Sequence, residues 1–286
     1  MKTEYMDRNT IFSKIKVCVK GGGDIASGVA FRLHQCGFSV FITEIEQPMA
    51  VRRKVSFCEA VYDGRTVVEG VEAVLVKDVE GIRFEWGTDK IPVIVDPACD
   101  SRRLIKPDVI VDGILAKKNT GTSLKDAPVT IALGPGFVAG KDALFVVETN
   151  RGHELGRLLV SGSAQPDTGV PGPVQGITRD RVLRAPAEGL WESQRHIGDP
   201  VKKGDIMGSV SGTEVKAVID GVLRGLIRPG IHVNKGLKIG DIDPRGRRDY
   251  CGTISDKALA VAGGVLEGIL RTSMFATAGR SATPSR

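Results

Sequence analysis

Short apolar runs separated by polar or amphipathic segments fill the first half of the chain. The clearest runs are IKVCV, SVFIT, IPVIVD, DVIVDGIL and VTIALG. They lack the strict alternation of apolar and polar positions that marks a strand with one face in water, so they are typical of strands buried on both faces of a parallel sheet. Because helical segments lie between several of them, the pattern predicts an α/β domain over residues 14–135.

The segment after the first apolar run has the most regular helical pattern. Ile25, Val29, Leu33 and Cys36 recur at spacings of four, four and three residues, so they share one face of a helix. Asp24 lies just before this pattern and is a residue type that caps helices. The sequence therefore predicts a helix that begins close to Asp24.

The pattern changes twice beyond the first domain. Residues 136–180 are rich in Gly and Pro, and irregular chain of this length inside a compact protein is usually functional or a linker. We expect this segment to complete a cleft. Residues 181–250 contain short β runs between glycine turns, which predicts a small all-β domain. Residues 251–272 predict a closing helix, and residues 273–286 a disordered tail.

Composition and charge narrow the possible functions. A length of 286 residues suits about two domains. No apolar stretch approaches the roughly 18–20 residues of a membrane helix, and the polar first ten residues do not resemble a secretory signal, so we expect a cytoplasmic protein without a membrane partner. The five cysteines form no CxxC pair, which favours reduced thiols over a metal site or a disulfide framework.

The net charge of +6 raises the possibility of nucleic-acid binding. However, the basic residues are scattered along the chain, and aromatic residues that could stack on bases make up only 5% of it. A small anionic ligand fits this composition better than nucleic acid does.

A glycine turn between the first strand and the first helix is the best candidate for a binding site. Gly21, Gly23 and Ala26 fit the G-x-G-x-x-G/A pattern, with Gly22 inside it. Small residues let a pyrophosphate approach the backbone, and the free N–H groups and dipole of the following helix attract an anion. Glu44 ends the second strand, where a dinucleotide site places the acid that binds a ribose hydroxyl.

The alternative is a turn that binds nothing, or binds another anion. Asp24 favours this alternative, because a carboxylate at the start of the helix repels a phosphate by up to about 1 kcal/mol. Arg52 and Arg53 follow the second strand and could accept the added phosphate of NADP, although surface arginines are the more common explanation. The predicted cofactor-binding set is Gly21, Gly22, Gly23, Asp24, Ala26 and Glu44.

Two further groups are candidate anion ligands. Lys117 and Asn119 follow an apolar run, and ligands gather at the carboxyl ends of strands in open α/β sheets. Asn150, Arg151 and His153 lie at the start of the segment HELGRLLV, a predicted short helix. A solvated loop is the favoured explanation for the first group, and a lone histidine such as His153 is more often structural than catalytic. No catalytic triad, HExxH motif or P-loop is recognisable, so the sequence predicts no catalytic residues.

Several motifs together resemble a known family. The segments GGGDIASGVAFRLHQCGF, DPACDS, AKKNTGT, VVETNRGHELGR and SGSAQPDTGVPG are similar to those of the YqeB family, and the resemblance covers residues 14–270. Its members are described as selenium-dependent molybdenum hydroxylase system proteins or molybdenum cofactor biosynthesis accessory proteins. The resemblance implies a Rossmann-like domain akin to that of the maturation factor XdhC, a molybdenum hydroxylase as partner, and a molybdenum cofactor as ligand. The glycine fingerprint offers NAD(P) as the other candidate cofactor.

The β region resembles half of a biotinyl or lipoyl carrier domain, most clearly in IGDPVKKGDIMGSV. Such carriers attach their cofactor to a lysine at a hairpin tip. Here the connecting turn, VSGTEVK, lacks the Met-Lys pair, and Lys216 is expected in the following strand. The resemblance therefore implies a barrel-sandwich fold that carries no biotin or lipoate.

Together these observations predict a Rossmann-like parallel-sheet domain with a small all-β barrel-sandwich domain. The leading functional hypothesis is an accessory factor for maturation of a selenium-dependent molybdenum hydroxylase, with a nucleotide or molybdenum cofactor bound at the glycine turn. The alternatives are a free-standing NAD(P)-dependent oxidoreductase and a non-catalytic binding scaffold. Whether the protein is an enzyme stays open at this point.

Overall fold

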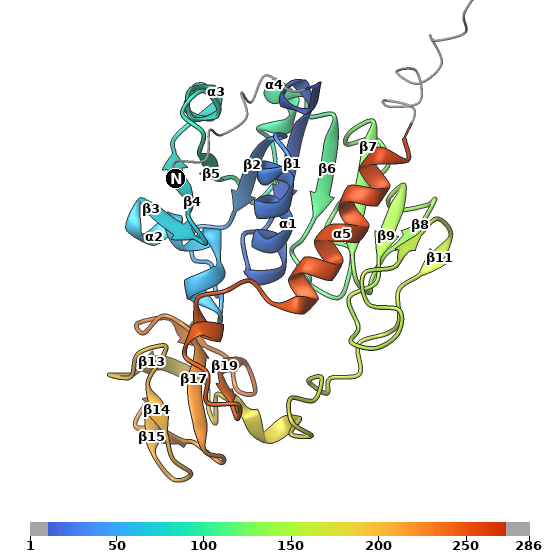
Figure 1. Ribbon diagram of the computed structural model, residues 1–286. Helices are drawn as coiled ribbons and strands as arrows, with labels where there is room; N and C mark the ends of the chain where they lie inside the picture. The colour runs from blue at the N-terminus through green and yellow to red at the C-terminus, as the bar shows by residue number, and fades with distance from the viewer. Residues whose placement is uncertain (1–10, 273–286) are drawn as a thin grey trace, which may run out of the picture.

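The computed structural model describes residues 11–272, which form a larger α/β domain and a smaller β domain beneath it (Figure 1). A nine-stranded sheet in the order β10-β9-β7-β6-β1-β2-β5-β4-β3 forms the centre of the larger domain. Its strands are β1 (Lys16–Lys20), β2 (Ser39–Glu44), β3 (Arg65–Val68), β4 (Val71–Val76), β5 (Ile91–Val95), β6 (Val109–Asp112), β7 (Val129–Leu133), β9 (Phe145–Val147) and β10 (Leu158–Leu159).

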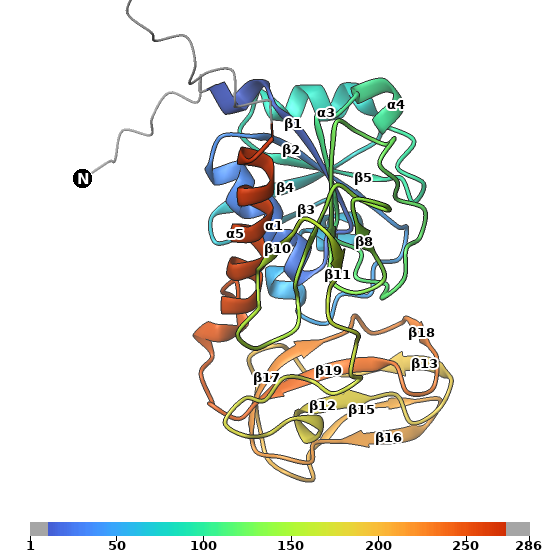
Figure 2. The same cartoon turned by 90° about the vertical axis from the view of Figure 1, so that its right-hand side faces the viewer.

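Helices cover both faces of this sheet (Figure 2). On one face, α1 (Asp24–Gln35) and α5 (Asp256–Leu270) pack on Val17 and Val19 of β1. On the other face, α3 (Val79–Trp86) and α4 (Arg102–Ile105) pack around Cys18 of the same strand. Alternate side chains of β1 therefore enter two separate apolar layers, which explains why its sequence shows no polar alternation.

The expected Rossmann-like, wholly parallel sheet is wrong, because the sheet is mixed. β3 pairs antiparallel with β4 at one edge, and β10 pairs antiparallel with β9 at the other. Glu69 and Gly70, with φ of 45° and 85°, form the two-residue connection from β3 to β4. Positive φ at both positions is typical of the tight turns of antiparallel hairpins. The hairpin lies in residues 52–87, where the sequence suggested short strands joined by turns, including the apolar run AVLV of β4, but did not define their bounds.

The smaller domain consists of two four-stranded antiparallel sheets, in the orders β12-β19-β17-β14 and β16-β15-β13-β18. Trp191 is fully buried between them. This arrangement replaces the expected biotinyl- or lipoyl-like domain. Its strands are β12 (Val182–Arg184), β13 (Gly189–Glu192), β14 (Pro200–Val201), β15 (Ile206–Val210), β16 (Thr213–Lys216), β17 (Gly221–Leu226), β18 (His232–Val233) and β19 (Lys238–Asp243).

The tip of the β15–β16 hairpin consists of Ser211 and Gly212, which both have positive φ. Lys216 lies in the strand after the tip, as the sequence predicted. It is the last residue of β16 and pairs with Ile206. The remaining short elements are α2 (Ala60–Asp63), β8 (Val138–Ala139), β11 (Gly162–Ser163), η1 (Ile11–Lys14), η2 (Arg53–Val55), η3 (Phe57–Glu59), η4 (Arg179–Arg181) and η5 (Asp249–Cys251).

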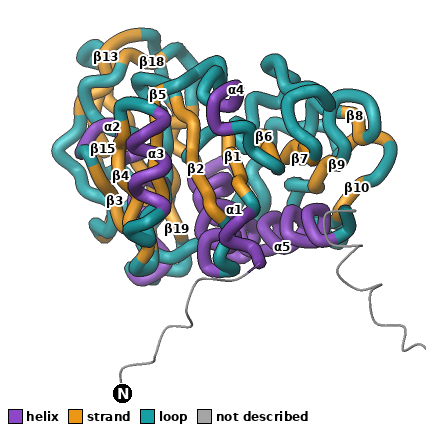
Figure 3. Tube along the Cα trace, turned by 90° about the horizontal axis from the view of Figure 1, so that it is seen from above, coloured by secondary structure: helices purple, strands orange, loops and turns teal. Residues whose placement is uncertain are grey.

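Small residues allow α5 to pack closely on the larger domain. Seen from above, α5 lies beside α1 and extends under β7, β9 and β10 (Figure 3). At the contact between the helices, a Cβ on Gly28 would lie 2.7 Å from the Cβ of Ala258. The predicted closing helix over 251–272 thus runs from Asp256 to Leu270, and the predicted tail at 273–286 lies outside the described residues.

The predicted helix HELGRLLV is wrong. The segment forms turns and then β10, and Gly156 has a φ of 82° that a helix does not tolerate. A Cβ on Gly156 would lie 2.6 Å from the carbonyl oxygen of Ala260. The turn therefore packs backbone to backbone against α5. Among residues 11–272, no helix is both long and apolar enough to span a membrane.

Candidate functional site

A cleft of about 560 Å³ lies at the carboxyl ends of β1, β2, β5 and β6. Its floor contains the glycine turn and the first residues of α1, and Lys238 of the smaller domain reaches its rim. In open α/β sheets, ligands bind at this edge because the loops that follow the strands converge there. Clefts of 300–1,000 Å³ are typical of small-molecule sites, so the cleft is the candidate functional site.

Glycine occupies each of the three positions of the turn for a different structural reason. Gly21 has a φ of 85°, and a Cβ there would lie 3.2 Å from the backbone of Ile114. A Cβ on Gly22 would lie 2.8 Å from the amide nitrogen of Cys58. Gly23, in contrast, faces open space, and a Cβ there would meet nothing within 4 Å. Packing therefore requires glycine at the first two positions, whereas Gly23 leaves the start of the helix open.

The start of α1 is uncapped. Gly23 is the N-cap and supplies no side chain, and Asp24, predicted as the cap, is the first helical residue. Within residues 11–272, the amides of Gly23, Asp24 and Ile25 have no hydrogen-bond acceptor. Free amides at a helix start attract anions, and the helix dipole adds to the attraction.

Glu44 stabilises the glycine turn from the end of β2. Its two carboxylate oxygens accept hydrogen bonds from the amides of Gly22, at 2.7 Å, and of Ile45, at 2.8 Å. Burial raises the pKa of Glu44, and these two hydrogen bonds oppose the shift. Each carboxylate oxygen can accept a second hydrogen bond, so Glu44 can both fix the turn and bind a hydroxyl group in the cleft.

Arg52 is the cation nearest the start of α1. It is 7% exposed, and its guanidinium donates to the carbonyls of Tyr250, at 2.8 Å, and Thr253, at 3.0 Å. It lies 3.9 Å from the carboxylate of Asp24, and its Nε has no partner within the described residues. Burial first, and the nearby charge of Arg224 second, lower the pKa of Arg52.

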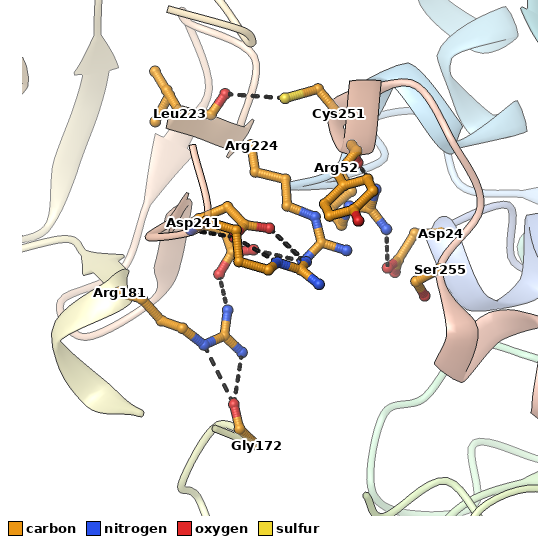
Figure 4. A network of polar contacts seen from close by, with 12 residues as sticks. Asp24, Arg52, Gly172, Arg181, Leu223, Arg224, Asp241, Cys251 and Ser255 are labelled. Carbon is orange, nitrogen blue, oxygen red and sulfur yellow. Dashed lines mark hydrogen bonds and ion pairs between the residues drawn. The ribbon is translucent and has the colours of Figure 1, made fainter. Parts of the chain in front are cut away.

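A charged network behind Arg52 joins the two domains (Figure 4). Arg224 lies 3.6 Å from Asp243 and 3.9 Å from Asp241, and its Nε also has no partner among the described residues. Arg181 donates to the carboxylate of Asp241 and to the carbonyl of Gly172. The network places two nearly buried guanidinium groups, those of Arg52 and Arg224, on facing sides of the domain boundary.

Lys20 supplies a second positive charge to the cleft floor, and the sequence analysis missed it. Its Nζ donates to the hydroxyl of Thr122 at 2.6 Å and lies 3.4 Å from the carboxylate of Asp112. Thr122 in turn donates to Asp112 at 2.6 Å. The available signal was a lysine at the last position of a buried strand, directly before the glycines.

The other predicted anion ligands lie outside the cleft lining. Lys117 pairs with Asp167 at 2.7 Å. Asn119 holds its own loop, because its side chain bonds the backbone of Thr122. The remaining three occupy separate surroundings: Asn150 bonds Gln165, Arg151 bonds Asp256, and His153 lines a shallower pocket beside Arg157 and Arg271.

The ion pair of Arg151 and Asp256 predicts a pH-dependent contribution to stability. Two hydrogen bonds of 2.8 Å from Arg151 hold the pKa of Asp256 well below its usual value. A carboxyl whose pKa is lower in the folded state stabilises the fold above its ordinary pKa and loses this contribution as the pH falls. Because the Asp256 side chain is 74% exposed, we expect an effect below about 1 kcal/mol.

Asp256→Asn should therefore lower the free energy of unfolding at pH 6, and the difference from wild type should shrink towards pH 2. Urea unfolding at several pH values measures this difference. Arg151→Gln and the double variant complete a double-mutant cycle, which isolates the pair energy. A difference that stays constant with pH would contradict a titrating pair.

The site is thus a small-molecule cleft at the edge of a mixed α/β sheet, with an open helix start and buried cations. Among residues 11–272, no group of three or more His, Cys, Asp or Glu side chains is placed to hold a metal ion. Sequence reasoning identified the glycine turn and Glu44, which do line the cleft. It assigned Arg52 a minor role and overlooked Lys20.

Comparison with known proteins found a relative that is similar over most of this chain. No family model matches the chain. A protein of Escherichia coli (strain K12), described as "Uncharacterized protein YqeB", is 51% identical over 256 residues, which is 89% of this chain and 47% of the relative. The chain thus spans about half the length of that relative.

Comparison with solved structures gave only weak matches. An aspartoacylase family protein from Mesorhizobium loti is 15% identical with a TM-score of 0.27, over 82% of this chain and 86% of the other. A succinylglutamate desuccinylase/aspartoacylase from Rhodobacter sphaeroides is 14% identical with a TM-score of 0.25, over 80% and 84%. Scores this low carry no argument about the fold or activity of this chain.

These findings overturn the expected identity and function. The relative named YqeB is described as uncharacterised, and no family model matches the chain. The expectations of an XdhC-related Rossmann-like domain, a selenium or molybdenum pathway and a maturation factor for a molybdenum hydroxylase are therefore wrong. The expected pathway and partner rested on the descriptions used within a family, whereas the Rossmann-like domain was also expected from the glycine turn and the apolar runs.

Proposed function

We propose that the cleft binds a phosphorylated small molecule of nucleotide size, with a phosphate at the start of α1. The observation that carries this proposal is the combination of uncapped amides and a buried guanidinium in one cleft. The amides of Gly23, Asp24 and Ile25 are free within the described chain, and Arg52 lies beside them. An anion at this point would gain hydrogen bonds, the helix dipole and a cation.

The pairing of Asp24 with Arg52 reduces the main objection to a phosphate here. Unpaired, the carboxylate of Asp24 would repel an anion. It lies 3.9 Å from the Arg52 guanidinium, and Arg224 adds positive charge behind Arg52. Lys20 on the cleft floor contributes a further cation. Arg224 and Lys20 are themselves paired with carboxylates, so the groups that favour an anion at the start of α1 are the free amides and the guanidinium of Arg52.

Part of the cleft lining is apolar and suits a heterocyclic base. Ile45, Met49 and Ile114 line it and are 41–48% exposed. Large apolar side chains exposed within a cleft are typical of ligand-binding surfaces. With Glu44 placed to accept a ribose hydroxyl, the cleft offers partners for base, sugar and phosphate. An adenine nucleotide, free or as part of NAD(P), contains all three groups.

Calorimetric titration tests this proposal. We expect ADP to bind at least about tenfold more tightly than adenosine, which corresponds to 1.4 kcal/mol from the phosphates. Parallel titrations with NAD⁺, NADP⁺ and pyrophosphate show which part of the ligand dominates. Higher salt should weaken ADP binding and leave adenosine binding almost unchanged. Equal affinity for ADP and adenosine would contradict the proposal.

We also propose a cytoplasmic location, because the five cysteines, which we expect to be reduced, suit that compartment.

A further inference from the structure

We propose that Cys18 and Cys99 form a reversible disulfide beneath the cleft and so couple ligand binding to the redox state of the protein. The disulfide itself depends only on the positions of the two thiols. Its effect on binding rests on the proposed function.

The two thiols already lie in contact. Cys18 is in the middle of β1, and Cys99 is in the loop after β5. Their sulfur atoms are 3.5 Å apart and hydrogen-bonded, and both residues are buried. A disulfide has an S–S distance of about 2.05 Å, so the sulfurs must approach by roughly 1.5 Å. Because β1 is held between β6 and β2 in the sheet, this approach requires the Cys99 loop to move.

The loop holds Cys99 in an unusual backbone conformation. Cys99 has a φ of 56°, in the left-handed region that residues other than glycine seldom adopt. The carboxylate of Asp96 fixes the loop by accepting hydrogen bonds from the amides of Asp100, at 2.9 Å, and Ser101, at 2.8 Å. The cost of the conformation at Cys99 is thus offset by neighbouring bonds, and such local strain is common at functional positions.

The environment makes the two thiols unequal. The hydrogen bond from Cys18 lowers the pKa of Cys99, whereas burial raises the pKa of Cys18. Burial and the charge of Asp96 oppose ionisation of Cys99, and the positive charge of Lys20 favours it to a smaller extent. The thiolate is the reactive form. Cys99 lies in the loop that follows the cleft-lining residues Asp96 and Pro97, whereas Cys18 lies in the central strand β1, so we expect Cys99 to attack an oxidant first and Cys18 to be the resolving thiol.

Hydrogen peroxide is an oxidant small enough for this buried pair. The Cys99 thiolate attacks one peroxide oxygen, the O–O bond breaks, and hydroxide leaves, which gives a sulfenic acid. The Cys18 sulfur then attacks the sulfur of Cys99, the S–O bond breaks, and water leaves. In sum, two thiols and one peroxide give one disulfide and two waters. A dithiol reductant reverses the change by thiol–disulfide exchange.

The consequence for the cleft follows from the loop. Asp96 and Pro97 line the cleft, and Cys99 follows them within the same turn. Moving Cys99 towards β1 displaces this wall. We expect oxidation to change the affinity for ADP at least about fivefold, the lower range of usual coupling between sites.

Peptide mapping tests disulfide formation without any ligand. After peroxide treatment and alkylation under denaturing conditions, we expect a Cys18–Cys99 cross-linked peptide that dithiothreitol removes. Cys36→Ser should retain the cross-link, although Cys36 is the most exposed of the five thiols. Cys18→Ser and Cys99→Ser should each abolish it. Recovery of both thiols alkylated, or of sulfinic acid on Cys99 without a cross-link, would overturn the proposal.

Titration of the reduced and oxidised protein with ADP tests the coupling. A difference of the expected size supports it, and equal affinity of a fully cross-linked sample overturns it. If the reduced protein binds no nucleotide, the proposed function fails, while the mapping result still decides whether the disulfide forms.

Discussion

Gly23→Asp is expected to weaken ADP binding by about 100-fold or more, because a new carboxylate within about 4 Å of a phosphate costs several kcal/mol at a protein surface. The substitution fits the fold, since the Gly23 position is open and has an extended backbone with φ of −68°. Aspartate at an N-cap also accepts hydrogen bonds from the free amides of α1. Binding should therefore fall while the free energy of unfolding stays equal or rises by a few tenths of a kcal/mol.

Gly23→Asn is the matched control. Asparagine has the same shape as aspartate and caps helices equally well, but it carries no charge. We expect it to weaken ADP binding far less than aspartate does. Calorimetric titration and thermal unfolding of both variants measure the two effects separately. Equal losses in both variants would mean that size rather than charge matters, and unchanged binding in both would place the ligand elsewhere.

Gly264→Ala is expected to destabilise the fold by about 1–3 kcal/mol, the usual range for overpacking in a core. A Cβ at this position would lie 2.2 Å from the carbonyl oxygen of Gly156 and 2.9 Å from the side chain of Val147. Neither the turn at Gly156 nor β9 can move without disturbing the sheet edge. The helix α5 would have to shift outward.

The neighbouring glycine provides the control for this prediction. Gly263 lies in the same helix, and a Cβ there would meet nothing within 4 Å. Gly263→Ala should therefore stabilise the protein by up to about 1 kcal/mol through helix propensity alone. Urea unfolding of the two variants should give opposite signs. A similar effect of both substitutions would contradict the close packing of α5 on the Gly156 turn.

Local patterns predicted the parts of the fold that depend on neighbours in sequence. The spacing of Ile25, Val29 and Leu33 predicted α1, and all three side chains are buried in it. Apolar runs located the central strands. The sequence suggested short strands joined by turns in the β3–β4 region but did not define the hairpin, because its turn, Glu69-Gly70, is not one of the dipeptides that signal a hairpin. Its antiparallel pairing makes the sheet mixed, which the strand pattern alone does not reveal.

The site was harder to predict because it depends on contacts between distant segments. Nothing in the sequence distinguishes Arg52 from other loop arginines. In the fold its guanidinium is buried and donates hydrogen bonds to the distant carbonyls of Tyr250 and Thr253. Arg224 faces it from the other domain, 172 positions along the chain. No periodicity connects these residues. Conversely, the sequence predicted Arg151 as an anion ligand, but in the fold its guanidinium is hydrogen-bonded to the carboxylate of Asp256.

The central claim is that an anion binds at the start of α1. The most direct measurement is a titration of the ¹⁵N-labelled protein with pyrophosphate, followed through the backbone amide signals. The account predicts that the largest saturable shifts belong to Gly23, Asp24 and Ile25, and that Gly23→Asp abolishes them. Largest shifts at the His153 pocket, or shifts at α1 that persist in Gly23→Asp, would contradict it.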